Sequence, residues 1–433
     1  MGKTIVEKIL AKAVGRQDIS PGEYIKLGIK DTYIQIGSDC DKPRAVADFE
    51  RLGWDKLWDP TKVMIVPDHC GSWTRPGDKN TNREAHRLTG EWARKMGVPE
   101  ENILELGRVG NCHQLALDNA WALPGAVYLN TDTHCPMVGG VGCFGVNLSA
   151  SETFFLRSGW MWFRVPKSIK FNISGKLQNG VMGRDIFEYI LSQIGPAGAL
   201  YQAMEYTGPV VDEMGMDSRI SMCCLSVFAG AKLGIVNPNQ KVIDWFRERT
   251  KVPFEPQVSD ADAEYAKIYE YDASKIEPQV VIPPYRRTAT KISDAEGIKI
   301  TTAFIGSCAS GRDEDFRMAA KILKGKKIHQ GVMFNITPGS SDVMRRIDKE
   351  GVISTLLEAG CLVCAPSCGM CPGFSTPLAK NEVCITSSTT NVPGRMGDES
   401  AQVYLGSPCN SCSIGNRRKD NRPEKISLRR KDK

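Results

Sequence analysis

Three cysteines on two glycine-rich turns constrain this chain more than any other feature. Cys308 follows an apolar segment, residues 303–305, and leads into a turn at Gly311. Cys368 and Cys371 share a later Cys-x-x-Cys turn between prolines and glycines. Three thiolates on two turns can bind three irons of a cubane cluster and leave the fourth iron open as a Lewis acid. A Cys-x-x-Cys pair alone is equally typical of zinc sites and redox pairs, so the rest of the chain has to decide.

Length and composition fit a protein of several domains. A chain of 433 residues is long enough for two or three domains, and 41% hydrophobic residues are ordinary for a globular protein. No segment is long and apolar enough to span a membrane, and residues 1–8 lack the apolar core of a signal peptide. Fifteen cysteines without a secretion signal favour metal ligands, catalytic thiols and core positions over disulfides. These features predict a cytoplasmic protein with no membrane partner.

The net charge of +6 resides in the C-terminal tail. Residues 417–433 contain nine basic and three acidic residues, so the rest of the chain is neutral. A neutral body argues against an extensive nucleic-acid surface. The tail is predicted to be a solvated extension, with an electrostatic contact to RNA or to a partner as the alternative.

Strand and helix patterns alternate along the chain and predict an α/β fold with three α/β domains. Domain 1 is predicted at residues 1–125, domain 2 at 126–295 with a linker near 240–295, domain 3 at 296–416 with the cluster cysteines, and a basic tail at 417–433. Four glycines between positions 139 and 145 predict a close approach of the backbone to a ligand or to another turn. Helices are expected at 4–14, 81–96, 184–194, 197–204, 221–233, 259–264, 313–323, 340–348 and 351–359, and strands at 62–66, 102–106, 126–130, 168–174, 298–305, 331–336 and 361–364.

Three of the five histidines lie in turns that follow apolar segments, where α/β folds build their sites. They are His69, His113 and His134. Asp68 precedes the first of them, and Asp132 lies two positions before the last. An aspartate beside a histidine sets the imidazole tautomer and suits proton transfer near neutral pH. We therefore predict a catalytic role for this set, although any one such histidine is more often structural.

Two arginines are candidates for binding an anionic substrate. Arg312 and Arg395 each follow a glycine in a turn. A guanidinium in that position can bind a carboxylate through two hydrogen bonds, or it can simply face solvent. The sequence leaves both interpretations open.

Two further cysteine pairs have weaker assignments. Cys361 and Cys364 would point to opposite faces of a strand, so we expect them in the core rather than at one metal. Cys409 and Cys412 form another Cys-x-x-Cys just before the tail. For this pair, unpaired thiols, a redox role and a zinc site completed by another chain remain open.

Taken together, the motifs resemble those of the aconitase superfamily, specifically large subunits of the isopropylmalate and homoaconitate dehydratase type. The resemblance covers nearly the whole chain, from Thr4 to about Ser407. It implies three α/β domains around a central 4Fe–4S cluster that is held by Cys308, Cys368 and Cys371. The matching segments are residues 67–69, 110–114, 131–134, 306–308, 368–371 and 394–397.

The resemblance also implies a hydro-lyase or isomerase that acts on a 2- or 3-hydroxy acid. The open iron would bind a carboxylate and a hydroxyl of the substrate. His69, with Asp68, would help to protonate the departing hydroxyl, and Asp132 would pair with His113. The family's alkoxide serine lies on a swivelling domain, which for a chain of this length implies a separate small subunit in a heterodimer or heterotetramer. The implied substrate-binding residues are Arg312, Arg395, Ser310 and Thr390.

Several positions near the substrate depart from the family pattern. Cys224 replaces an asparagine, and Phe228 replaces the glutamate that orients the histidine matching His134. Thr389 and Thr390 replace an asparagine and an arginine, so one arginine expected to hold a carboxylate is missing. Losing such a contact typically costs about 2–5 kcal/mol of binding, which predicts a substrate less anionic than isopropylmalate or different in shape. The alternative is a non-catalytic or regulatory relative, with the cluster as a sensor and the basic tail bound to RNA or a partner.

Overall fold

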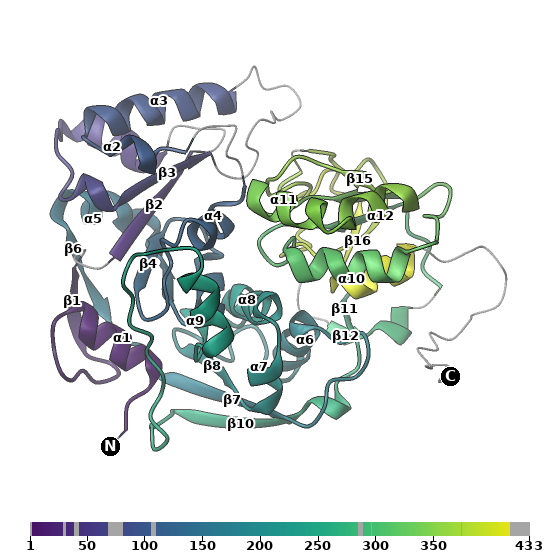
Figure 1. Cartoon of the computed structure of the whole chain (residues 1–433), viewed down its shortest axis with the longest axis horizontal. Helices are drawn as coiled ribbons and strands as arrows, with labels where there is room; N and C mark the ends of the chain where they lie inside the picture. The colour runs from purple at the N-terminus through teal and green to yellow at the C-terminus, as the bar shows by residue number, and fades with distance from the viewer. Residues whose placement is uncertain are drawn as a thin grey trace.

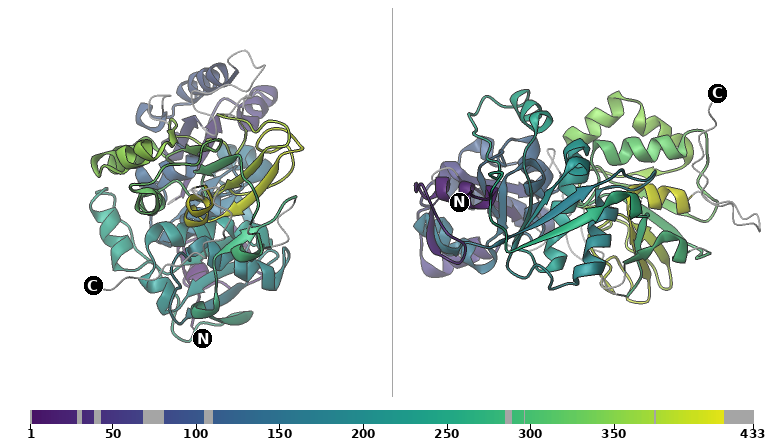
Figure 2. Two further views of the ribbon diagram at one scale, coloured as in Figure 1. Left: turned by 90° about the vertical axis from the view of Figure 1, so that its right-hand side faces the viewer. Right: turned by 90° about the horizontal axis from the view of Figure 1, so that it is seen from below.

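Mainly parallel sheets covered by helices form the framework of the protein, as the alternation of strands and helices predicts (Figure 1). This computed structural model describes residues 2–28, 32–38, 43–67, 81–104, 110–284, 289–295, 297–373 and 375–415. Within these ranges, none of the helices has the length and apolar character needed to cross a membrane. We divide the chain into three units by its three large sheets. In the right-hand view of Figure 2, the purple elements of the first unit and the yellow elements of the third lie toward opposite ends, with teal elements of the second unit between them.

The first unit spans residues 2–164. Its elements are α1 (Ile5–Ala13), β1 (Tyr24–Gly28), β2 (Thr32–Ser38), α2 (Arg44–Leu52), η1 (Pro60–Lys62), β3 (Val63–Pro67), α3 (Thr81–Lys95), η2 (Glu100–Asn102), α4 (Cys112–Asp118), β4 (Val127–Asn130), η4 (Cys135–Val141), β5 (Phe144–Asn147), η5 (Ser149–Ser151), α5 (Glu152–Ser158) and β6 (Trp160–Arg164). The sheet is parallel in the order β3-β2-β4-β5, and β1 pairs separately with β6. Every residue of β3 and β4 is buried, as expected of strands covered on both faces.

The second unit contains a parallel sheet whose last strand returns beside its first. Its elements are β7 (Ser168–Ser174), α6 (Gly183–Ile194), β8 (Ala203–Thr207), α7 (Pro209–Glu213), α8 (Met216–Leu225), η6 (Ser226–Ala229), β9 (Leu233–Val236), α9 (Gln240–Arg247), β10 (Lys267–Asp272) and η7 (Ala273–Lys275). The strand order is β10-β7-β8-β9. Aromatic stacking joins the outer pair of strands, because the ring of Phe171 in β7 lies 5.1 Å from that of Tyr269 in β10.

The third unit contains a seven-stranded sheet. Its elements are β11 (Gln279–Val281), β12 (Ala289–Lys291), η8 (Ile292–Ala295), β13 (Thr302–Ile305), α10 (Asp313–Leu323), β14 (Met333–Ile336), α11 (Ser341–Lys349), α12 (Val352–Ala359), β15 (Leu362–Val363), β16 (Val383–Thr386), β17 (Gln402–Gly406) and α13 (Pro408–Gly415). The order is β12-β11-β17-β16-β13-β14-β15, with β11 antiparallel to both of its neighbours. Strand β13, between β16 and β14, is buried at every residue, which places its carboxyl end in the interior.

Most of the predicted helices and strands are present. The helix predicted at 4–14 is α1, and it begins where Thr4 and Glu7 form a capping box. The strand predicted at 168–174 is β7. In the third unit, the helices predicted at 313–323, 340–348 and 351–359 are α10, α11 and α12. Apolar residues recur in these elements with the period of a helix or a strand, so the local sequence was enough to predict their structure.

Three predicted helices are wrong in whole or in part. Residues 197–204 form turns and the start of β8, after Gly195 with a φ of 75°. The helix predicted at 221–233 breaks at Gly230, with a φ of 77°, and β9 follows. Residues 259–264 form a turn, in which Asp260 accepts a hydrogen bond from the backbone N–H of Lys3 at 2.8 Å. The strand predicted at 102–106 is reduced to a bridge between Ile65 and Ile103, and its last two residues lie outside the described residues.

The strand pairing differs from the predicted division of the chain. β4 and β5 belong to the sheet of the first unit, although they follow residue 125. The predicted linker at 240–295 contains α9, the strand β10 of the second sheet, and the strands β11 and β12 of the third. These pairings join strands that are distant in sequence, and local composition does not reveal them.

The glycines at 139–145 let η4 approach the second unit closely. An ideal Cβ on Gly139 would lie 1.8 Å from the carbonyl oxygen of Gly234 in β9. One on Gly140 would lie 2.5 Å from the Cα of Ile220 in α8. These distances exclude any side chain at either position. The predicted close backbone approach is confirmed, and it fixes the loop that follows His134.

Candidate active site

One cavity gathers side chains from the first and third units. Its empty volume is about 310 Å³. The three cysteines predicted as cluster ligands, three of the five predicted catalytic residues and one of the two predicted arginines contribute to its wall. The lining residues are Asn111, Cys112, His113, Asp132, His134, Cys308, Cys368, Cys371, Pro372, Thr389 and Arg395.

The cavity lies beyond the carboxyl ends of parallel strands in two sheets. Asp132 and His134 follow β4, Cys308 follows β13, and Thr389 follows β16. Open α/β sheets bind ligands beyond these ends, because each strand there gives way to a loop whose side chains are free to face a crevice. Two sheets that direct these ends at one point therefore build a single site from distant segments.

Backbone conformation brings the three cysteines to the cavity. Ser307, just before Cys308, has a φ of 68°, and Gly369 between the paired cysteines has a φ of 61°. A Cβ on Gly369 would lie 2.5 Å from Oγ1 of Thr337, so this turn accepts only glycine. All three thiols are buried apart from their contact with the cavity.

Positive charge lies beside one of these thiols. Burial opposes ionisation of Cys371, but the Arg395 guanidinium and hydrogen bonding from Thr389 lower the pKa of the thiol below its usual value. The Thr389 hydroxyl lies 3.6 Å from the Cys371 sulfur. Burial opposes the charge of Arg395, but the nearby Cys371 thiolate raises the pKa of its guanidinium. This corner of the cavity is suited to a thiolate ligand and to an anionic substrate group.

Two histidines in the wall of the cavity share one aspartate. Nε2 of His113 lies 2.7 Å from Oδ1 of Asp132, and Nδ1 of His134 lies 3.5 Å from the same oxygen. Burial alone would raise the pKa of Asp132, but its hydrogen bonds with both histidines hold it well below the usual value. The carboxylate is therefore ionised and orients both rings.

Two of the residues that depart from the family pattern lie directly behind this wall. The ring of Phe228 packs against that of His134, with 5.8 Å between centroids. A phenyl ring cannot accept the hydrogen bond that a glutamate would, and Asp132 takes its place as the partner of His134. Cys224 is fully buried, and its thiol, together with burial, raises the pKa of the Cys308 thiol.

The other predicted substrate-binding residues do not line the cavity. Arg312 is 2% exposed, and its guanidinium donates to the backbone carbonyls of Cys308 at 2.8 Å and Ala309 at 3.0 Å. Ser310 is buried beside this turn, and Thr390 is partly exposed next to Thr389. The structure therefore brings Arg395 to the cavity and places Arg312 behind the Cys308 turn.

Some site residues lie outside the prediction or outside the described residues. Asp68 and His69 belong to the latter group. Asn111, which the sequence analysis did not single out, lines the cavity and caps α4 by accepting a hydrogen bond from the N–H of Gln114 at 2.9 Å. The signal was an asparagine at the start of a short helix, one of the preferred capping residues.

Comparison with known proteins identifies the family. A family model described as the aconitase family (aconitate hydratase) matches residues 38–296 and 284–411. The chain belongs to the aconitase family. A 3-isopropylmalate dehydratase large subunit from Halothermothrix orenii is 37% identical over 94% of this chain and 96% of the relative. One from Desulfitobacterium hafniense is 37% identical with the same coverage. A crystal structure of aconitase X from Thermococcus kodakaraensis has a TM-score of 0.48 and 11% identity, and the match covers 89% of each chain.

Membership of the aconitase family confirms the predicted fold class and the predicted enzyme class, a hydro-lyase. It also implies an iron–sulfur cluster, and the donor set in the cavity fits one. Among the described residues, no three His, Cys, Asp or Glu side chains are grouped closely enough to share one metal ion. A cubane does not need such a group, because each thiolate binds a different iron. Three separate thiols facing one cavity are the arrangement that a cluster requires.

Proposed function

We propose that this chain is the large subunit of a 4Fe–4S dehydratase or isomerase that acts on a small hydroxy acid. The observation that carries the proposal is a single cavity lined by three thiols, an Asp–His pair and an arginine. Cys308, Cys368 and Cys371 would hold three irons and leave the fourth without a protein ligand. When bound, such a cluster supplies a Lewis acid that polarises the carboxylate and hydroxyl of the substrate.

The chain's own residues would bind the substrate and move protons. Asp132 accepts from Nε2 of His113 and so leaves Nδ1, which has no hydrogen-bond partner among the described residues, as the basic nitrogen. His134 shares the same aspartate and completes this proton-handling wall. His69, with Asp68, is assigned the protonation of the departing hydroxyl on the strength of the family resemblance.

Arg395 is the described arginine that lines the cavity, so we assign the substrate carboxylate to it. Arg312 directs its donors at the carbonyls of the Cys308 turn, so we assign it the support of that turn. Thr390 directly follows the lining residue Thr389, and Ser310 lies two positions after Cys308, so both are secondary candidates for substrate contact.

The substrate we propose is less anionic than a malate-type dicarboxylate. Thr390 occupies the position at which the family resemblance implies a second carboxylate-binding arginine, and a threonine supplies no charge. The ring of Phe228 lies where a glutamate is expected and makes that side of the site more apolar. A site with fewer charges leaves a second buried carboxylate without a partner, which lowers the affinity for a dicarboxylate.

We propose a small subunit as the obligatory partner, in a heterodimer or heterotetramer. The relatives are named large subunits, and the alkoxide serine of the family lies on a swivelling domain that is separate in chains of this length. The described cysteines are all free thiols, which suits a reducing, cytoplasmic compartment.

The test is an anaerobic co-expression of this chain with a small subunit, which is to be sought in the coding region next to its own. We expect iron and sulfide in the purified complex, and reversible hydration of an unsaturated monocarboxylic acid in preference to a dicarboxylic one. Replacing Cys368→Ser should abolish both cluster and activity. The matched control is Cys361→Ser, since Cys361 is buried in the core and away from the cavity. A complex without iron, or one with iron that prefers isopropylmalate, would contradict the cluster or the substrate assignment respectively.

A further inference from the structure

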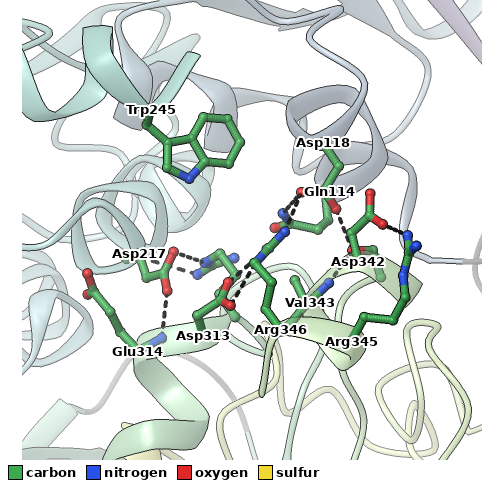
Figure 3. A network of polar contacts seen from close by, with 12 residues as sticks. Gln114, Asp118, Asp217, Trp245, Asp313, Glu314, Asp342, Val343, Arg345 and Arg346 are labelled. Atoms are coloured by element: carbon green, nitrogen blue, oxygen red, sulfur yellow. Dashed lines mark hydrogen bonds and ion pairs between the residues drawn. The ribbon is translucent and has the colours of Figure 1, made fainter. Parts of the chain in front are cut away.

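The three units also meet at a cluster of buried and half-buried polar side chains beside the cavity, most of which have no role in the proposed chemistry. We call this the junction cluster, and it comprises Asp118, Asp217, Arg312, Asp313, Ser340 and Arg346. Its members come from α4 in the first unit, from α8 in the second, and from the third unit at the start of α10, the N-cap of α11 and the last turn of α11. Figure 3 shows Asp118, Asp313 and Arg346 directed at one another from separate helices, with Asp217 nearby.

One end of the junction cluster holds the helix that carries His113. Asp118, the last residue of α4, has a side chain only 2% exposed. It accepts hydrogen bonds from the Ser340 hydroxyl and from Nε2 of Gln114, the latter at 3.1 Å, and Nη1 of Arg346 lies 3.8 Å away. A buried carboxylate needs such partners, because an unpaired one is strongly destabilising. The partners supplied by the third unit therefore fix the end of α4.

The other end of the junction cluster holds the turn that carries Cys308. Arg346 forms two hydrogen bonds with Asp313, both 2.8 Å long, from Nε and Nη2. Asp313 directly follows Arg312, whose guanidinium donates to the carbonyl oxygen of Cys308. A guanidinium bound through two hydrogen bonds is held in direction as well as in distance. The connection from Asp118 to Cys308 is therefore continuous.

A second connection runs through the backbone. The N–H of Asn111 donates to the carbonyl of Gly339 at 2.8 Å, and the N–H of Gly339 donates to that of Gly311 at 2.7 Å. Ser340 follows Gly339, so its hydroxyl and the preceding backbone bind opposite ends of α4. A Cβ on Gly110 would lie 2.7 Å from the Gly339 carbonyl oxygen, which shows how closely these two segments of the backbone approach each other.

We propose that Asp118 and Ser340 are a positioning pair that sets His113 in register with the Cys308 turn. The inference rests on the proposed function, in which the proton-handling histidine and the cluster act on the same substrate. Neither residue touches the cavity, so they act through the helix and the turn. A shift of about 1 Å between reacting groups can lower a rate by about 100-fold.

The alternative is that the pair merely stabilises the fold, and the variants are chosen to separate the two. Ser340→Ala removes the hydroxyl that donates to Asp118, but also the cap of α11, because the same oxygen accepts from the N–H of Val343. Asp118→Ala leaves that cap intact. Effects common to both variants belong to the pair. Ser340→Thr keeps the hydroxyl and should restore wild-type behaviour. The control is Asp342→Asn, which breaks an exposed ion pair with Arg345 on the same helix.

The experiment measures hydrogen exchange and kinetics on the purified complex with its small subunit. We expect both alanine variants to speed exchange in residues 110–118 and also in 307–312, and to lower kcat about tenfold or more with KM nearly unchanged. Faster exchange confined to α11, or a lower melting temperature with unchanged kcat, would overturn the proposal. If the wild-type complex has no hydro-lyase activity, the proposed function fails, and exchange in 307–312 still decides whether the pair couples the two segments.

Discussion

Two of the three Cys-x-x-Cys motifs of this chain, first Cys368 with Cys371 and second Cys409 with Cys412, have opposite surroundings. Cys368 and Cys371 lie in a turn at the cavity, whereas Cys409 and Cys412 lie on α13, which packs against α10 and β13. Burial does not distinguish them, because Cys371 is 4% exposed and Cys412 is fully buried. The neighbours do. Arg395 and Thr389 lower the pKa of Cys371, whereas burial raises the pKa of Cys409 to about 11.

The difference shows that spacing alone does not make a metal site. A helix holds two cysteines three positions apart on one face, and α13 places Cys412 among apolar side chains of the third unit. The turn at Gly369 instead directs its cysteines toward a third thiol, Cys308, that comes from another strand. Among the described residues, Cys409 and Cys412 have no third His, Cys, Asp or Glu placed to share a metal ion with them.

Removing one cysteine from each motif tests most directly whether only the first motif binds the cluster. We expect Cys368→Ser to lose the cluster entirely, because a serine hydroxyl is a poor ligand for iron. We expect Cys412→Ser to retain it, since that thiol faces the core. Iron and sulfide analysis of anaerobically reconstituted protein, with the visible absorbance, measures the difference. Iron loss in both variants, or zinc bound at Cys412, would erase the distinction.

The next largest effect concerns the charge beside the first motif. Arg395→Gln should raise KM for the hydroxy acid by about 10- to 100-fold, because a charge-assisted pair with the substrate carboxylate is replaced by a neutral contact. Iron content should stay near the wild-type level, which separates substrate binding from cluster binding. Steady-state kinetics give the result, with Arg345→Gln at an exposed position as the control. An unchanged KM would remove Arg395 from the substrate site.

A smaller effect concerns stability at the second motif. Cys412→Ser buries a hydroxyl among apolar side chains and should cost about 1–3 kcal/mol of unfolding free energy. Cys412→Ala should cost less, since it adds no polar group. Urea titration of both variants measures the difference. A serine variant as stable as the wild type would mean that this thiol has a polar environment after all.

The smallest expected signal is the absence of a reaction. Because burial raises the pKa of Cys409 to about 11, only about one molecule in a thousand carries the thiolate at pH 8. Iodoacetamide at pH 8 should therefore leave Cys409 unlabelled in the native protein and label it after unfolding. Mass spectrometry of the digested protein reads this out. Fast labelling of the native protein at pH 8 would show that α13 opens or that the thiol is accessible.

Local pattern accounts for much of what could be predicted. The capped helix after Thr4, the alternating strand 168–174 and the amphipathic helices of the third unit follow from the period of their apolar residues. The misjudged segments are those where a glycine with a positive φ or a distant partner decided the conformation, as at Gly230 and Asp260. The grouping of β4 and β5 with the first sheet depends on strand pairing, which local composition does not encode.

The candidate site divides in the same way. The types and order of its residues, from His113 and Asp132 to Cys308, Cys368 and Cys371, determined the family and the expected cluster. The tertiary structure decided which arginine reaches the cavity, because Arg395 and Arg312 have similar turn sequences and only the packing of the units separates them. It also decided that Cys409 and Cys412 lie away from the cavity, and which residues bind Asp118. Spacing along a chain fixes which groups are available, whereas burial and charge at a point in space depend on every segment that meets there.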